Sequence, residues 1–428
     1  MVDIKAFEGI TYNKKKVGDL GSIVTPPHDV ISPEDQETYY ESSPYNIVRL
    51  ILGKPREDDT ADENQYTRAA KLLEEWLSSG ILEKDPESAI YAYEQEFALE
   101  NGSTKKQLGF ISLVKLEPFE KGVILPHERI ISKMKEDRLN LMKACRANMS
   151  LIITAYSDKK LATDRMLKEK TADAPAMEVT FGKKECTHRV WPIHDKEFIE
   201  EFTSFFKDKK LYIADGHHRY TTALEYHLNH DKTDASRYMM MFALNMEEDG
   251  VTILPAHRVL KNIRGFSVED MKKKLSNCFD VKEYGKEDED AFFTELESRK
   301  KENFFGMYCG NGKLYLLELK DASVMDELEG IPEVWKRMDV IILDKLILAK
   351  ILGVDSSEYA EQEDLVFKKE RKKALACVDE KEFEVAFFLN PTSMHEVKDA
   401  AEAGERMPQK STYFYPKPLS GLVINKFD

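Results

Sequence analysis

The stretch Lys210-Leu-Tyr-Ile-Ala-Asp-Gly-His-His-Arg-Tyr220 joins a buried strand to a helix through an Asp-Gly turn. The apolar run that ends at Ala214 is typical of a central strand, and the residues after Gly216 place apolar side chains on one face of a helix. Asp215 therefore lies near the N-cap, and the first helical turn holds backbone N–H groups that have no partner within the helix. This segment predicts a protein that mixes helices with sheet.

Three potential cations, His217, His218 and Arg219, follow the turn directly. A helix N-terminus is the positive end of the helix dipole, where each cation is unfavourable by ~0.3–1 kcal/mol. A bound anion explains the cluster, because N–H groups, imidazoles and a guanidinium together can bind phosphate, and Gly216 lets the backbone approach it. Two alternatives stay open: an exposed polar helix end, and a metal site that includes Asp215. Neighbouring residues on a helix point ~100° apart, so adjacent histidines seldom bind one ion.

A second cluster, Leu125-Pro-His-Glu-Arg129, follows a predicted strand end. The carboxylate of Glu128, beside a histidine, has the chemistry of a general base that deprotonates a hydroxyl. The alternative interpretation is a charged surface turn, which these residues alone favour.

The tail from Met407 to Lys417 places Lys410, Ser411 and Thr412 among aromatic side chains. One lysine followed by two hydroxyls suits a carboxylate or phosphate, but the glycines of a Walker loop are missing. By itself, this tail is more typical of a segment packed on the body of the protein. Two weaker candidates are the turn Pro26-Pro-His-Asp-Val30 and the strand end Pro255-Ala-His-Arg258.

The composition is that of a globular protein. The chain has 428 residues, of which 42% are hydrophobic and 33% charged, and this excludes a disordered or disulfide-scaffold protein. Its net charge of −15 repels polyanions, so we expect no nucleic-acid partner. We expect a cytoplasmic protein without a membrane partner. The five cysteines are scattered, the sequence shows no signal-peptide pattern, and no apolar run reaches about 18 residues.

The order of predicted elements indicates an α+β protein of several parts. We expect an N-terminal α+β part over 1–160, a core over 161–261 that carries the Asp-Gly turn, and a C-terminal α+β part over 262–428 whose tail returns to the site. Within the last part, Gly310-Asn-Gly312 between two apolar runs predicts a β-hairpin of Phe304–Cys309 with Lys313–Leu319.

Five ordered motifs resemble the family catalogued as domain of unknown function 1015. They are Thr25-Pro-Pro-His-Asp-Val-Ile-Ser32, Leu125-Pro-His-Glu128, Ala214-Asp-Gly-His-His-Arg-Tyr220, Leu254-Pro-Ala-His-Arg258 and Met407-Pro-Gln-Lys-Ser-Thr-Tyr-Phe-Tyr-Pro-Lys417. Three of them are also similar, in the same order, to motifs of archaeal free serine kinases, which have a ParB/sulfiredoxin-like nucleotide-binding fold. The present chain is longer, and Gln409 and Ser411 stand where those kinases have Pro and Thr.

This resemblance implies a kinase that transfers a phosphoryl group from ATP or ADP to a hydroxyl, with free L-serine as the expected acceptor. It assigns proton acceptance to Glu128 and binding of Mg²⁺ to Asp215. It assigns the remaining residues to phosphate or acceptor binding, as follows: Gly216, His217, His218 and Arg219 to the phosphates, and Lys410, Ser411 and Thr412 to the amino acid. Because Arg219 lies at a helix end, we expect its substitution to leave the fold intact.

Two other functions stay open at this point. One is a nucleotide-dependent switch of ParB type without turnover, and the other is a metal-dependent hydrolase that uses His217, His218 and Asp29. The sequence also leaves open a homodimer.

Overall fold

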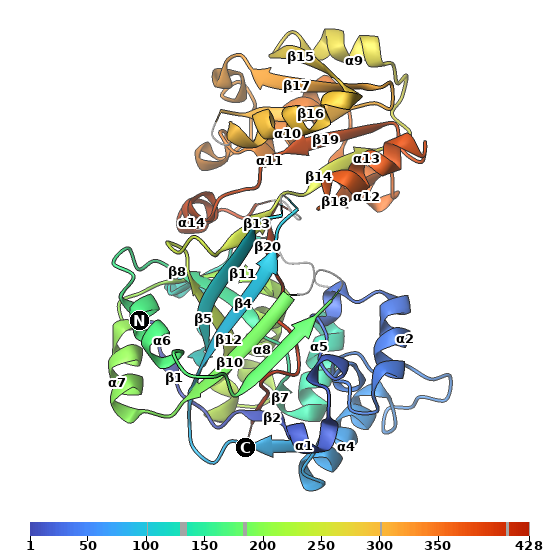
Figure 1. Ribbon diagram of the computed structural model, residues 1–428. Coiled ribbons are helices and arrows are strands. Elements are labelled where there is room, and N and C mark those ends of the chain that lie inside the picture. The colour runs from blue at the N-terminus through green and yellow to red at the C-terminus, as the bar shows by residue number, and fades with distance from the viewer. Residues whose placement is uncertain (101, 129–134, 183–185, 300–301, 408–410, 428) are drawn as a thin grey trace. The chain divides into compact units, whose positions relative to one another are not determined.

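The computed structural model describes the chain except for residues 101, 129–134, 183–185, 300–301, 408–410 and 428 (Figure 1). It divides into two compact units: unit 1 comprises Met1–Thr252 and Pro416–Asp428, and unit 2 comprises Ile253–Tyr415. This division differs from the one expected from the sequence, because the parts expected at 1–160 and 161–261 contribute strands to one sheet. The last residues of the chain, Pro416–Asp428, belong to unit 1.

Unit 1 is built on a mixed sheet that has nine strands in the described residues. Strands β11 and β6 are parallel, as are β12 and β8, whereas the other neighbouring pairs of this sheet are antiparallel. In spatial order the strands are β6 (Ile124–Leu125), β11 (Leu211–Asp215), β8 (Ile152–Tyr156), β12 (Tyr238–Asn245), β5 (Thr104–Lys115), β4 (Ile90–Ala98), β10 (Cys186–Ile193) and β9 (Met177–Phe181), with β1 (Ile4–Lys5) paired to β5.

Helices cover this sheet and close its core. The longer helices of unit 1 are α2 (Pro33–Ser42), α4 (Gln65–Ser78), α5 (Lys135–Cys145), α6 (Ala162–Lys170), α7 (Lys196–Phe205) and α8 (His217–Asn229). Phe110 of β5 packs edge-on against Phe202 of α7, with ring centroids 4.8 Å apart. Tyr220 of α8 stacks on Phe119 at 5.1 Å. The first contact holds α7 on the sheet, and the second holds α8, and with it the Asp-Gly turn, against the 3₁₀-helix Phe119–Lys121.

Unit 2 has an antiparallel sheet of six strands in its described residues. Their order is β15 (Phe279–Gly285), β17 (Lys313–Leu319), β16 (Phe304–Tyr308), β19 (Val385–Leu389), β14 (His257–Leu260) and β18 (Leu365–Lys368). The predicted hairpin is confirmed, since β16 and β17 pair antiparallel. The helices are α9 (Val268–Leu275), α10 (Glu289–Ser298), α11 (Asp339–Ile341), a π-helix (Ile342–Ile351), α12 (Ser356–Glu361), α13 (Arg371–Asp379) and α14 (Met394–Glu402).

The α+β class is therefore confirmed, with a large mixed sheet in unit 1. Within the described residues, no helix combines the length and the apolar character needed to cross a bilayer.

Candidate functional site

The strand–turn–helix segment forms as predicted. Strand β11 ends at Asp215, and α8 begins at His217. Between them, Gly216 adopts a φ of +92°, a left-handed conformation that favours glycine. A Cβ at this position would lie 3.1 Å from the guanidinium carbon of Arg219. The glycine therefore leaves room for the buried side chain of Arg219, and its expected role beside a phosphate stays a prediction.

Asp215 lies between two cations. Its Oδ2 accepts a 2.7 Å hydrogen bond from Nη2 of Arg219, and its Oδ1 accepts one from Nζ of Lys417. Arg219 also donates to the carbonyl oxygen of Leu151. Burial alone would raise the pKa of Asp215, but the charges of Lys417 and Arg219 outweigh it and hold this pKa well below its usual value.

This arrangement changes two predicted roles. Arg219 has a side chain only 7% exposed and holds Asp215, so it does not present a free guanidinium to a phosphate. Asp215 was expected to bind Mg²⁺, but each of its oxygens already accepts from a cation, and an approaching dication would meet both positive charges. The residues present thus do not fit Asp215 as a direct metal ligand. Among the residues that the structure describes, no group of three or more His, Cys, Asp or Glu side chains could hold a metal ion.

Glu128 lies near His217, the first residue of α8. Its Oε2 is 3.8 Å from Nδ1 of His217, and its side chain is about one-third exposed. Nε2 of His217 accepts a 3.3 Å hydrogen bond from the backbone N–H of His127. When neutral, the His217 ring therefore carries its proton on Nδ1, the nitrogen near Glu128.

The His127 ring packs against His217 and is itself held by strand β11. Its Nδ1 lies 2.8 Å from the carbonyl oxygen of Ile213, which can only accept, so this nitrogen carries the proton. The rings of His127 and His217 meet edge to face at 4.8 Å. Strand β11 thus positions the Pro-His-Glu motif through its own backbone.

The first turn of α8 is suited to an anion. Gly216, its N-cap residue, offers no capping side chain, and the first turn contains no acidic residue. The N–H groups of a first helical turn have no acceptor within the helix, and together with the helix dipole they favour a negative ligand. Asp215 pairs with two cations at this helix end, Arg219 and Lys417.

The structure therefore brings together Glu128 with His217, and Asp215 with Arg219, around one helix end, where His218 is half-buried. Of the residues expected to bind the acceptor, Lys410 is outside the described residues, and Ser411 and Thr412 belong to unit 2. The backbone carbonyl of Ser411 accepts from Oγ1 of Thr392.

The sequence assigns no role to Lys417, the last residue of the tail motif. Lys417 lies 202 positions from its partner Asp215, so no local periodicity could pair them. The signal available was a second lysine of the tail motif, placed between Pro416 and Pro418.

The comparisons with known proteins agree with the motif analysis at the level of the family. The chain belongs to the family described as "Protein of unknown function (DUF1015)", whose model matches residues 4–341. No curated protein matches it.

Solved structures resemble the chain weakly. A free serine kinase in complex with AMP is 13% identical, with a TM-score of 0.34, over 68% of this chain and 84% of that one. SbnI with a C-terminal truncation from Staphylococcus aureus is 14% identical, with a TM-score of 0.35, over 72% and 85% of the two chains. A conserved hypothetical protein from Pyrococcus furiosus is 14% identical, with a TM-score of 0.32, over 68% and 87%.

Proposed function

We propose that this protein is a small-molecule kinase, which transfers a phosphoryl group from ATP or ADP to a hydroxyl, with free L-serine as the acceptor and O-phosphoserine as the product. The observation that carries the proposal is the placement of Glu128 beside His217 at the uncapped, cationic N-terminus of α8. Phosphoryl transfer needs charge neutralisation and positioning more than covalent chemistry. Both requirements have suitable groups in this part of unit 1.

The phosphates would bind at the first turn of α8. Its N–H groups, the imidazole of His218 and the ammonium of Lys417 supply donors and positive charge. Arg219 contributes as a positioning residue, because it holds the carboxylate of Asp215, which in turn holds Lys417. Mg²⁺ enters this proposal with the nucleotide's phosphates.

Glu128 would act on the acceptor. As the hydroxyl oxygen attacks phosphorus, its proton passes to the Glu128 carboxylate, and the bond from phosphorus to the nucleotide oxygen breaks. The proton on Nδ1 of His217 would orient the second carboxylate oxygen. A carboxylate in this position contributes typically ~10²–10⁴-fold as a general base.

Two parts of the proposal rest on motif order alone. They are the assignment of Lys410, Ser411 and Thr412 to the acceptor, and the description of the core as ParB/sulfiredoxin-like.

The test is incubation of the protein with ATP or ADP, Mg²⁺ and L-serine, with new phosphomonoesters read by ³¹P NMR. We expect O-phosphoserine to form, and the Glu128→Gln variant to lower kcat by ~10²–10⁴-fold with little change in the KM for nucleotide. Glu120→Gln is the matched control, since Glu120 is an exposed carboxylate of the neighbouring turn.

Two results would contradict the proposal. One is the absence of any phosphomonoester with a pool of hydroxyl-bearing metabolites. The other is a kcat for Glu128→Gln within about threefold of wild type, far short of the general-base range. Metal analysis of the purified protein distinguishes the proposed kinase from a metal-dependent hydrolase. Stoichiometric, tightly bound zinc or iron would favour the hydrolase.

A further inference from the structure

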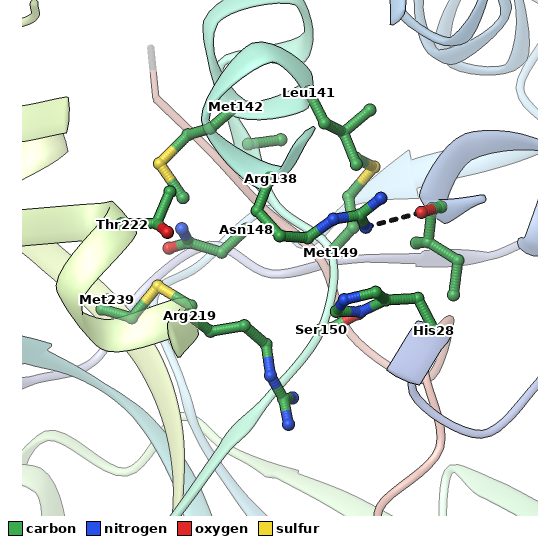
Figure 2. Close-up of a pocket in the computed structure, with 12 residues that line it drawn as sticks. His28, Arg138, Leu141, Met142, Asn148, Met149, Ser150, Arg219, Thr222 and Met239 are labelled. Atoms are coloured by element: carbon green, nitrogen blue, oxygen red, sulfur yellow. Dashed lines mark hydrogen bonds between the residues drawn. The ribbon is translucent and has the colours of Figure 1, made fainter. Parts of the chain in front are cut away.

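A cavity lies on the face of α8 that carries Arg219 and Thr222, which are three positions apart (Figure 2). Its volume of about 50 Å³ has room for about four water-sized groups. Its other walls come from the 3₁₀-helix η2 (His28–Val30), from α3 (Val48–Ile51), from α5, from β12 and from the segment 147–150. All of these elements belong to unit 1.

Three buried polar atoms in the walls of this cavity have no hydrogen-bond partner in the described structure. They are Nδ1 of His28, Nδ2 of Asn148 and Oγ1 of Thr222. Asn148 and Thr222 are only 2% and 1% exposed. A buried polar group without a partner costs ~1–3 kcal/mol, and native proteins contain few of them. Three such atoms around one cavity indicate a ligand that pairs with them.

The charge around the cavity favours an anion. The side chains of Arg138 and Arg219 both line it. Arg138 pairs with Asp137, and Arg219 with Asp215. The positive charge of both arginines is nevertheless felt in the cavity, because, in addition to burial, it lowers the pKa of the lining residue His28.

His28 adds a neutral polar group to this cationic surface. Burial, and then the nearby charges of Arg138 and Arg219, lower the pKa of His28 to about 2. Its ring is therefore uncharged near neutral pH and can donate or accept one hydrogen bond.

The remaining wall is apolar and adaptable. It is made by Ile51, Leu141, Met142, Ala147, Met149 and Met239. Methionine side chains adjust to small ligands of varied shape. The cavity thus offers a positive and polar side opposite an aliphatic side.

We propose that this cavity binds a short aliphatic carboxylate that also carries a hydroxyl or an amino group. The carboxylate accepts from the Asn148 amide and lies in the positive field of the two arginines. The second polar group pairs with Thr222 and His28, and the short carbon chain lies on the methionines. This inference does not rest on the proposed kinase function, because it concerns equilibrium binding on another face of α8.

The test is isothermal titration calorimetry of the full chain with L-lactate and glycolate, and with L-lactamide and glycolamide as uncharged controls, without nucleotide. We expect the carboxylates to bind at least tenfold more tightly than the amides. Thr222→Val keeps the shape of the side chain but removes the unpartnered hydroxyl, and it should weaken binding about tenfold. Thr221→Val is the matched control, because the Thr221 hydroxyl donates to carbonyls of its own helix.

His28→Leu provides a second variant, on a different segment, that removes the ring nitrogens. It should also weaken carboxylate binding about tenfold. Amides that bind as tightly as the carboxylates, no binding of either carboxylate, or wild-type affinity in both Thr222→Val and His28→Leu would each overturn the proposal.

Discussion

Replacing Lys417 with methionine tests the pair that joins the tail to Asp215. The two side chains are only 9% and 19% exposed. Removing one partner of a buried ion pair costs ~3–5 kcal/mol when the other charge is left alone. In Lys417→Met, Nη2 of Arg219 still lies 2.7 Å from Oδ2 of Asp215, so the carboxylate keeps one of its two cationic partners. We therefore expect Lys417→Met to lower the free energy of unfolding of unit 1 by about 2–3 kcal/mol at neutral pH.

The pH dependence of this effect has a definite sign. The folded protein holds the pKa of Asp215 below its unfolded value, so the stabilisation is fully present above about pH 4 and is lost as the pH falls further. Lys417→Met moves this pKa back towards its ordinary value. The difference in stability between wild type and variant should be constant from pH 8 to 5 and should shrink below about pH 4.

Urea unfolding followed by tryptophan fluorescence measures this difference. The chain has three tryptophans, and in a Trp335→Phe background the remaining two, Trp76 and Trp191, both lie in unit 1. Lys426→Met is the control, since Lys426 lies in the same tail but pairs with a glutamate that is 63% exposed, and such pairs contribute ~0–1 kcal/mol. A loss for Lys417→Met no larger than that of the control would refute the assignment.

Three further predictions follow from the same region. Arg219→Ala should destabilise unit 1 by ~3–5 kcal/mol in the same urea assay, because it leaves Asp215 and the Leu151 carbonyl without a buried partner; a variant as stable as wild type would restore the surface role expected from the sequence. Gly216→Ala should lower the free energy of unfolding by more than the ~1–2 kcal/mol of left-handed strain alone, because the new Cβ meets Arg219. Gly122→Ala is the control, since Gly122 has a φ of +64° and no atom within 4 Å of its Cβ position, so it should show the strain only. Equal losses of stability in the two variants would contradict the contact with Arg219. The pKa of His28 is lowered to about 2 in the folded protein. Below about pH 6.5 the unfolded chain therefore takes up a proton at this residue that the folded chain does not, and the folded state loses stability as the pH falls. His28→Gln should reduce this loss by about 1.4 kcal/mol per pH unit between about pH 6 and 4.

The sequence predicted those parts of the site that depend on local pattern. The β11 strand, the Asp-Gly turn and the start of α8 follow from one apolar run and one glycine, and the β16–β17 hairpin follows from its Gly-Asn-Gly turn. The pairing of β6 with β11, which brings Glu128 to His217, is a contact between residues far apart in the chain. Only the order of the motifs indicated it.

The direction in which Arg219 points could not be predicted from the sequence. At a helix N-terminus, an arginine can face a ligand in solvent or turn back to the strand that precedes it, and both choices give the same sequence pattern. The packing of the Leu151 carbonyl and the tail lysine decides between them. The same holds for the cavity next to Thr222, whose walls come from six separate segments of the chain.

The position of Arg219 has a consequence for both proposed sites. Its guanidinium lines the cavity and also donates to Asp215, which in turn accepts from Lys417 at the proposed phosphate site. A carboxylate in the cavity draws on the same positive charge that stabilises Asp215, so Asp215 then depends more on Lys417. A phosphate that draws Lys417 away makes Asp215 depend more on Arg219. Since coupling between two ligands is reciprocal, we expect each ligand to weaken the binding of the other by the same factor through the shared Asp215.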